Sequence, residues 1–186
     1  MNETLKVINH RRSIRSYKPE QLKDEDVKTI VEAGVYAPTA MNQQKWHFTV
    51  VQNKTMLDKM MDTVRGNIAK SEIPGLAERA GTPDFNVYYN APTVIIVTIS
   101  EEARWADFDC GAAAENIALA AESLGIGSVM LGMGAFACEG EKGAALMKEL
   151  GIPAGYRHVI SISLGYQTDP NPPVPPRNMD VINYVK

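Results

Sequence analysis

The chain has 186 residues, a length typical of one globular domain. Hydrophobic residues make up 45% of the chain and charged residues 22%, a composition that excludes an intrinsically disordered protein. The formal net charge of −3 argues against a nucleic-acid-binding protein, because such proteins need a basic surface for phosphate contacts.

The spacing of apolar residues predicts helices and strands along most of the chain. The expected elements are, in chain order, a helix at 4–8, a helix that begins at 24 and stops between 34 and 38, a strand at 47–51, a helix at 54–68, a strand at 93–99, a helix at 107–124, a strand at 127–131, a helix at 140–150 and a strand at 158–164. In the second helix, Asp24 is the expected N-cap. Its expected buried face is Val27, Ile30, Val31 and Val35. With no internal repeat and no linker, this pattern favours one α+β domain, residues 1–186, with a mixed sheet.

Two segments break the regular pattern. Residues 66–90 contain glycine and proline interruptions and an aromatic cluster, so we expect a lid that contacts a substrate. Residues 166–186 carry five prolines between 170 and 176, which forbid a helix and favour an extended arm. An arm of this length could lie across a partner subunit.

The helix expected at 107–124 is apolar nearly all round. Six alanines surround it with small side chains, which let a second helix approach closely. Such a helix must be buried nearly all round, and a domain of this size rarely buries a helix completely by itself. We therefore expect it to lie between the two subunits of a homodimer. A central core helix of a monomer is the alternative.

The N-terminal residues are polar and charged, which argues against a signal peptide. No apolar run approaches the ~20 residues that span a bilayer, so no membrane contact is expected. Cys110 and Cys138 lie far apart and form no CxxC pair. Two such cysteines favour reduced thiols and a cytoplasmic location.

Basic residues crowd into positions 10–18 of this acidic chain, which predicts a local anion site. Arg11, Arg12 and Ser13 could bind a phosphate dianion through forked, charge-assisted hydrogen bonds. Arg15 is close enough to reach another part of the same ligand. A solvated run of arginines is the alternative.

Two further segments offer ligand contacts. Residues 38–46 hold hydroxyl and amide groups that suit a planar heterocycle or a polyol, although an ordinary loop with Trp46 in the core is equally compatible. Gly132 and Gly134 follow a strand and permit close approach of a ligand, or simply form a turn. They do not match a dinucleotide fingerprint, which disfavours a Rossmann-type site.

No side-chain chemistry stands out from the sequence. The histidines show no metal-ligand spacing, neither cysteine has a histidine partner nearby, and no pair of carboxylates is evident. We therefore expect no metal site, and we expect any chemistry to belong to a bound cofactor.

Taken in order, five segments resemble the nitroreductase family of FMN enzymes. They are RRSIRSYKPE at 11–20, AGVYAPTAMNQQKWHFTVV at 33–51, APTVIIV at 91–97, DCGAAAENIALAAESLGIGSVMLG at 109–132 and SLGYQ at 163–167. The resemblance implies a three-layer sandwich, with a mixed, mainly antiparallel sheet flanked by helices, in an intertwined homodimer. It also implies FMN as cofactor, NADH or NADPH as electron donor, and a small acceptor such as a nitroaromatic or a quinone, reduced by a ping-pong mechanism.

The resemblance further implies a set of FMN contacts. Arg11 and Ser13 would hold the phosphate, helped by Arg177 on the arm, and Arg12 would lie beside the ribityl chain or the phosphate. The remaining contacts would be Arg15 at the pyrimidine edge, Pro38, Thr39, Ala40 and Asn42 from the other subunit, Met130, Leu131 and Gly132 along the flavin face and its N5 edge, and Asn86 at the ring.

The chain departs from the family pattern at three places. Leu131 precedes the glycine near N5, where many members have an acidic residue; Thr39-Ala40 replaces Ser-Ser, and Gln44-Lys45-Trp46 replaces Gln-Pro-Trp. These departures concern the choice of acceptor more than flavin binding. A specialised branch, for flavin fragmentation or reductive dehalogenation, is one alternative function, and a non-enzymatic flavin-binding or redox-sensing module is another.

Overall fold

The apolar strands of this chain assemble into one sheet that carries helices on both faces. A computed structural model describes all 186 residues. Its elements are α1 (Glu3–His10), α2 (Asp24–Val35), the 3₁₀ helix η1 (Ala40–Asn42), β1 (Trp46–Val51), α3 (Lys54–Ile68), α4 (Leu76–Ala80), β2 (Thr93–Ser100), α5 (Ala106–Ser123), β3 (Gly127–Leu131), the 3₁₀ helix η2 (Gly132–Ala137), α6 (Gly140–Glu149) and β4 (Tyr156–Gly165).

The four strands are antiparallel to their neighbours, in the order β1-β2-β4-β3. β2 lies in the interior of the sheet, which explains its continuous apolar sequence. A single parallel bridge joins Ser13 to Ser128 at the edge of β3. The sheet is therefore mainly antiparallel with one parallel contact, as the family resemblance implied.

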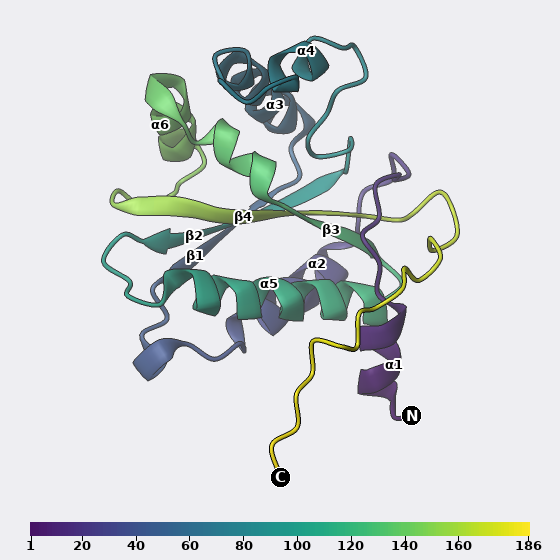
Figure 1. The fold of residues 1–186 in the computed structure, drawn as a ribbon. Coiled ribbons are helices and arrows are strands. Elements are labelled where there is room, and N and C mark those ends of the chain that lie inside the picture. The colour runs from purple at the N-terminus through teal and green to yellow at the C-terminus, as the bar shows by residue number, and fades with distance from the viewer.

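Helices cover the two faces of the sheet and make a three-layer sandwich (Figure 1), which confirms the expected fold class. α1, α2 and α5 lie on one side, and α3, α4, α6 and η2 on the other. Alternate residues of β2 supply the two cores. Ile95 packs into the cluster that contains Ile30 and Ile117, whereas Ile96 packs into the cluster that contains Met60.

The expected details of α2 need two corrections. Asp24 is the first helical residue and not the N-cap; Lys23 occupies the cap position without a side-chain hydrogen bond. Asp24 instead belongs to an acidic first turn, which interacts favourably with the positive end of the helix dipole. Val35 is 44% exposed, and Gly34 takes its place on the buried face. A side chain at Gly34 would collide with Ile117, because a Cβ would lie 2.8 Å from its Cγ1.

The alanine-rich helix α5 is buried on one side only. Cys110, Ala113, Ile117 and their neighbours are in the core, but Phe108 is 76% exposed and Trp105, just before the helix, is 48% exposed. Helix α1 has no buried residue at all. A single chain therefore does not enclose α5, contrary to what a monomeric core helix would require.

The segment 66–90, the expected lid, is partly built into the core. It contains the five-residue helix α4, which is too short for its periodicity to be read from the sequence. Phe85, Val87 and Tyr88 at its end are buried in the core beside α3. The segment therefore contributes a fixed wall as well as an outer part.

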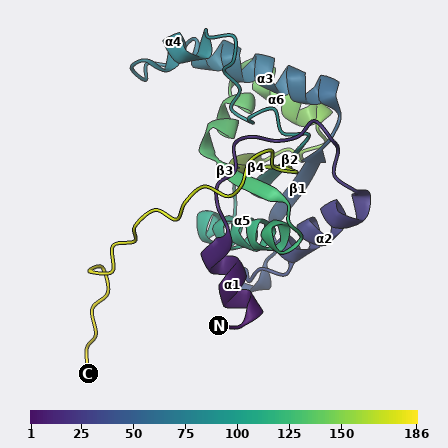
Figure 2. The ribbon, with the colours of Figure 1, turned by 90° about the vertical axis from the view of Figure 1, so that its right-hand side faces the viewer.

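Residues 132–134 begin the 3₁₀ helix η2 rather than a simple turn. The arm after β4 has no helix or strand, as expected, and Figure 2 shows it leaving the body of the molecule. None of the helices combines the length and the hydrophobicity that crossing a bilayer requires.

Candidate functional site

The basic segment at 11–18 lies along the edge of the sheet. The backbone N–H of Ile14 donates to the carbonyl of Ser128 on β3 at 2.9 Å. This close approach needs Gly127, where a Cβ would lie 2.9 Å from Cγ2 of Ile14. Further along, the N–H of Lys18 donates to the carbonyl of Tyr166 at 2.7 Å. These contacts fix the positions of the residues between them, including Arg15.

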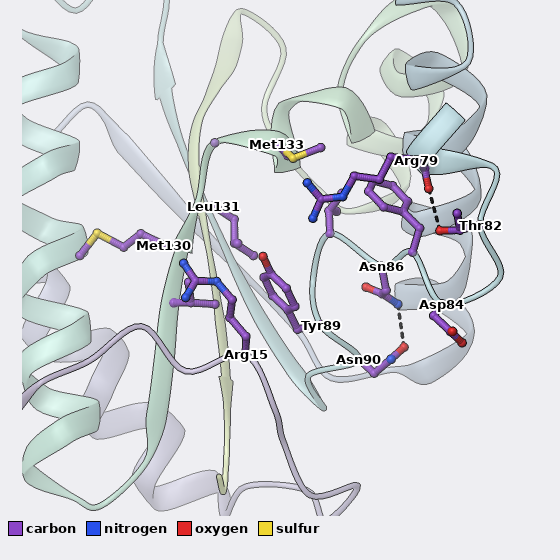
Figure 3. A pocket seen from close by; sticks show the side chains of 14 residues that line it. Arg15, Arg79, Thr82, Asp84, Asn86, Tyr89, Asn90, Met130, Leu131 and Met133 are labelled. Atoms are coloured by element: carbon purple, nitrogen blue, oxygen red, sulfur yellow. Dashed lines mark hydrogen bonds between the residues drawn. The ribbon is translucent and has the colours of Figure 1, made fainter. Parts of the chain in front are cut away.

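A cavity of about 520 Å³ opens where this segment meets β3, η2 and the end of the segment 66–90 (Figure 3). Its volume lies in the range of small-molecule sites. It brings together five of the residues that the sequence assigned to the cofactor, namely Arg15, Asn86, Met130, Leu131 and Gly132. Half of its fourteen lining residues are hydrophobic, so it offers an apolar surface with a few polar groups.

Tyr89 supports the guanidinium of Arg15 at one end of this cavity. The Cζ atom of Arg15 lies 5.7 Å from the centre of the Tyr89 ring, within the range of a cation–π contact. Nη1 of Arg15 also donates to the carbonyl of Ser13 at 3.3 Å. No carboxylate pairs with Arg15, so its positive charge remains available to a ligand.

The wall beside Arg15 has a constrained backbone. Tyr89 and Asn90 have φ angles of 56° and 54°, a left-handed conformation that is uncommon for residues other than glycine. Asn86 holds this turn together: its Nδ2 donates to Oδ1 of Asn90 at 2.8 Å, and its Oδ1 accepts from the N–H of Tyr88 at 2.8 Å. The Asn86 amide is therefore fixed in orientation at the cavity wall.

The two remaining arginines of the basic segment have different surroundings. Nε of Arg11 is buried without a well-formed hydrogen bond, although Oε1 of Glu115 lies 3.4 Å away. Arg12 is buried and donates from Nη1 to the carbonyls of Asn9 at 2.8 Å and Arg11 at 2.6 Å. Arg12 thus binds the backbone at the end of α1, whereas Arg11 faces Glu115 on α5; the Nε of each is buried without a well-formed hydrogen bond.

Ser13 and Arg15 border a second hollow of about 300 Å³, which the start of the C-terminal arm closes with Asp169, Pro170 and Pro172. Because this hollow shares Arg15 with the main cavity, an elongated ligand could extend from one to the other.

The residues predicted to come from the other subunit lie elsewhere in this chain. Pro38, Thr39 and Ala40 border a hollow of about 420 Å³ together with Trp105 and Phe108. The Ala40 N–H donates to Asp109 at the start of α5, at 3.1 Å, whereas Arg11 meets the same helix more than a turn later, at Glu115.

Asn42, also predicted to come from the other subunit, is exposed and has a left-handed φ of 51°. Its Oδ1 accepts from Nε2 of Gln44 at 2.9 Å. Arg177 is exposed on the arm and has no ion pair or side-chain hydrogen bond. The last hydrogen bond from the arm to the body is at Asn171, whose Nδ2 donates to the carbonyl of His10 at 3.3 Å. One chain alone therefore does not join Asn42 or Arg177 to the cavity.

The side chains of the cavity include no cysteine and no histidine. Burial raises the pKa of Cys110 to about 12 and that of Cys138 to about 11, so both remain protonated at neutral pH. No three His, Cys, Asp or Glu side chains gather in a way that could hold a metal ion. The cavity can bind and orient a ligand, but it offers no activated nucleophile.

Sequence reasoning assigned five of the fourteen lining residues and missed the other nine, among them Arg79, Tyr89 and Met133. Tyr89 belongs to an aromatic cluster that is visible in the sequence. Met133 stands between two glycines that the sequence also marked as possible ligand contacts. Nothing in the sequence marked Arg79, because its position depends on the short helix α4.

Comparison with known proteins agrees with this fold. A crystal structure of a nitroreductase with bound FMN from Bacteroides fragilis shares 35% identity over all of both chains, with a TM-score of 0.95. Another, from Desulfitobacterium hafniense, shares 37% identity over all of both chains, with a TM-score of 0.89. An Archaeoglobus fulgidus protein, provisionally named NADH dehydrogenase/NAD(P)H nitroreductase, is 38% identical over 175 residues, 91% of this chain and 88% of its own. The family model described as "Nitroreductase family" matches residues 8–166, and the chain therefore belongs to the nitroreductase family.

Proposed function

We propose that the chain is an NAD(P)H-dependent FMN oxidoreductase that reduces a small acceptor, such as a nitroaromatic or a quinone, by a ping-pong mechanism. The observation that carries the proposal is the open, half-apolar cavity with an unpaired Arg15 and no nucleophile of its own. Membership of the family supports it, as do the bound FMN and the NAD(P)H named for the similar proteins.

The residues present fit FMN at both ends of the proposed site. At the phosphate end, Arg11 has a buried Nε without a well-formed hydrogen bond, and Ser13 lies beside the hollow that adjoins the cavity. At the ring end, a Cβ on Gly132 would meet nothing within 4 Å, so the backbone there is open to a flat ligand. Met130 and Leu131 supply the adjoining apolar surface.

When bound, FMN would supply reversible two-electron chemistry, which suits hydride transfer between a nicotinamide and an acceptor. The chain supplies the electrostatics. The positive charge of Arg15 would stabilise negative charge on the pyrimidine side of a reduced flavin, and the Tyr89 ring holds the guanidinium in position. Asn86 fixes the wall beside Arg15, through its two hydrogen bonds.

We further propose that the working form is a homodimer. The exposed faces of α1 and of the start of α5 carry large apolar side chains, including Leu5, Ile8, Trp105 and Phe108, which mark an interaction surface. The arm exposes a further set, namely Val174, Met179, Val181, Ile182, Tyr184 and Val185. A second chain would cover these surfaces and would bring Pro38, Thr39, Ala40 and Asn42 of the partner subunit to the cavity.

The dimer proposal is tested by sedimentation of the protein and of its Phe108→Glu variant. We expect the wild type to sediment as a dimer and the variant, which places a charge on the apolar surface, to dissociate and to lose FMN. A monomeric wild type that retains stoichiometric FMN would overturn the proposal. The matched control is Phe108→Leu, which retains an apolar side chain and should stay dimeric.

The oxidoreductase proposal is tested by the visible spectrum of the purified protein and by anaerobic titration with NADH and then NADPH. We expect a flavin spectrum that one equivalent of at least one nicotinamide bleaches, and that an added acceptor restores. Bound flavin that neither nicotinamide reduces would refute the proposal and favour a flavin-binding or redox-sensing module. The expected compartment is the cytoplasm, since Cys110 and Cys138 are free thiols.

A further inference from the structure

The cavity contains a second cation, far along the chain from Arg15. Arg79 lies on α4, and Figure 3 shows its guanidinium extending across the cavity toward Met133. Its Cζ lies 5.8 Å from the centre of the Phe85 ring. Because Phe85 is buried at 7% exposure, the ring is a fixed platform, and the cation–π contact limits where the guanidinium can go.

The backbone of Arg79 is also held in place. Its carbonyl accepts from the N–H of Thr82 at 3.2 Å and from the Thr82 hydroxyl at 2.8 Å. Ala80, the next residue, is buried in the core. The wall below is tied to α3, since Nη2 of Arg65 donates to the carbonyls of Pro83 at 3.2 Å and Phe85 at 2.7 Å. The guanidinium of Arg65 thus stabilises the wall through hydrogen bonds, whereas the guanidinium of Arg79 faces the cavity.

The guanidinium of Arg79 has no partner within the chain. It makes no hydrogen bond and no ion pair. Asp84, the one acidic residue that lines the cavity, has no basic atom within ion-pair distance, and Figure 3 shows its side chain directed outward. In a chain with a net charge of −3, an unneutralised arginine over an apolar wall has five donors available for a ligand.

We propose that Arg79 forms an anion subsite in this cavity, so that the preferred acceptors carry a carboxylate at the end remote from the group that is reduced. A guanidinium binds a carboxylate through two parallel, charge-assisted hydrogen bonds, and the Phe85 platform orients that fork. This inference rests on the proposed function, in that the acceptor is reduced in the same cavity. Arg79 acts by binding the acceptor and takes no part in the transfer itself.

The test compares two acceptors that differ in charge, 4-nitrobenzoate and the neutral 4-nitrobenzyl alcohol. Reduction of either nitro group to a nitroso group consumes one NAD(P)H and one proton and releases one water. We expect wild-type kcat/KM to be about tenfold higher for 4-nitrobenzoate, as for a charge-assisted pair that is partly exposed to solvent. Arg79→Gln should remove that preference, with kcat/KM for the neutral acceptor unchanged within about twofold, and Arg79→Lys should restore part of it.

A binding measurement supplies a readout that does not depend on turnover. Benzoate should perturb the absorption of the bound flavin, with a dissociation constant about tenfold weaker in Arg79→Gln than in wild type, at equal FMN content. Lys148→Gln is the matched control, because it removes one exposed positive charge from α6, outside the cavity. This control should leave the preference between the two acceptors unchanged.

The outcomes separate this inference from the proposed function. If wild type reduces neither nitro compound with NADH or NADPH, the proposed function fails. If it reduces 4-nitrobenzyl alcohol but shows no preference for 4-nitrobenzoate, or if Arg79→Gln affects both acceptors equally, only the anion subsite fails. A selective rise in KM for NADPH in Arg79→Gln would assign the residue to the phosphate of the donor and would also overturn the acceptor subsite.

Discussion

His158 makes the stability of the fold depend on pH in a way that can be measured. It lies on β4, where Nε2 is 2.9 Å from Oγ of Ser161. Helix η2 packs tightly over this pair: a Cβ on Gly134 would lie 2.8 Å from Cβ of Ser161 and 3.2 Å from Nε2 of His158. This packing limits the hydration of a charged imidazole, and burial lowers the pKa of His158 from its ordinary value of 6.5 to about 4.

The sign of the effect follows from the two pKa values. Above pH 6.5 the imidazole is neutral in both the folded and the unfolded chain, so it contributes no pH dependence. Between pH 6.5 and 4 the unfolded chain binds the proton more tightly, and the free energy of unfolding therefore falls as the pH falls. Each pKa unit corresponds to about 1.4 kcal/mol, so we expect a loss of about 3 kcal/mol at pH 4 and below.

The assay is urea denaturation of wild type and His158→Gln, followed by circular dichroism at pH 7.5, 6.5, 5.5 and 4.5. Protein concentration and FMN occupancy are held constant, because both bias the equilibrium. The acidic residues titrate in both proteins, so the difference in free energy between them isolates His158. We expect the advantage of wild type over the variant to shrink by about 2.5 kcal/mol between pH 7.5 and 4.5. Parallel pH profiles would refute the reasoning.

Two further predictions follow from the packing and from the proposed phosphate contacts. Gly143→Ala should destabilise the chain by about 3 kcal/mol in thermal denaturation, because its Cβ would lie 2.6 Å from the carbonyl oxygen of Cys138, a backbone atom that cannot move aside. Gly66→Ala, in α3 with nothing within 4 Å of the new Cβ, should instead stabilise it by about 0.5–1 kcal/mol, and equal effects of the two substitutions would contradict the packing argument. Arg11→Ala combined with Arg177→Ala should yield protein that purifies without flavin; stoichiometric FMN in the double variant would exclude these residues from phosphate binding.

Local patterns sufficed to predict most of the secondary structure. The helix at 54–68 matches α3 at both ends, because Met60, Met61 and Val64 recur with helical spacing. The strand at 127–131 likewise matches β3. Hydrophobic periodicity predicted the wrong buried residue where a tertiary contact decides between two adjacent positions of a helix. Val35 and Gly34 fit the helical period about equally well, and the tight approach of Ile117 decided which of them is buried.

The candidate site likewise has a part that the sequence predicts and a part that depends on the tertiary structure. The arginine cluster and the glycines after β3 could be identified along the chain, because their residue types carry phosphate-binding and close-approach chemistry irrespective of the fold. Their order, together with the alanine-rich helix, was enough to indicate the family, which the family model confirms. The roles of Arg11 and Arg12 could not be separated from sequence alone, since only the turn at the end of α1 directs Arg12 inward to backbone carbonyls.

The sequence by itself determined most of the elements and the family of this protein, and it predicted an anion site in the basic segment. Only the tertiary structure showed that α5 has an uncovered face and that Arg79 shares a cavity with Arg15. The physical reason is that periodicity and residue chemistry are local properties. The meeting of Arg15 with Arg79 instead depends on how a five-residue helix and a sheet edge pack together, which no local pattern records.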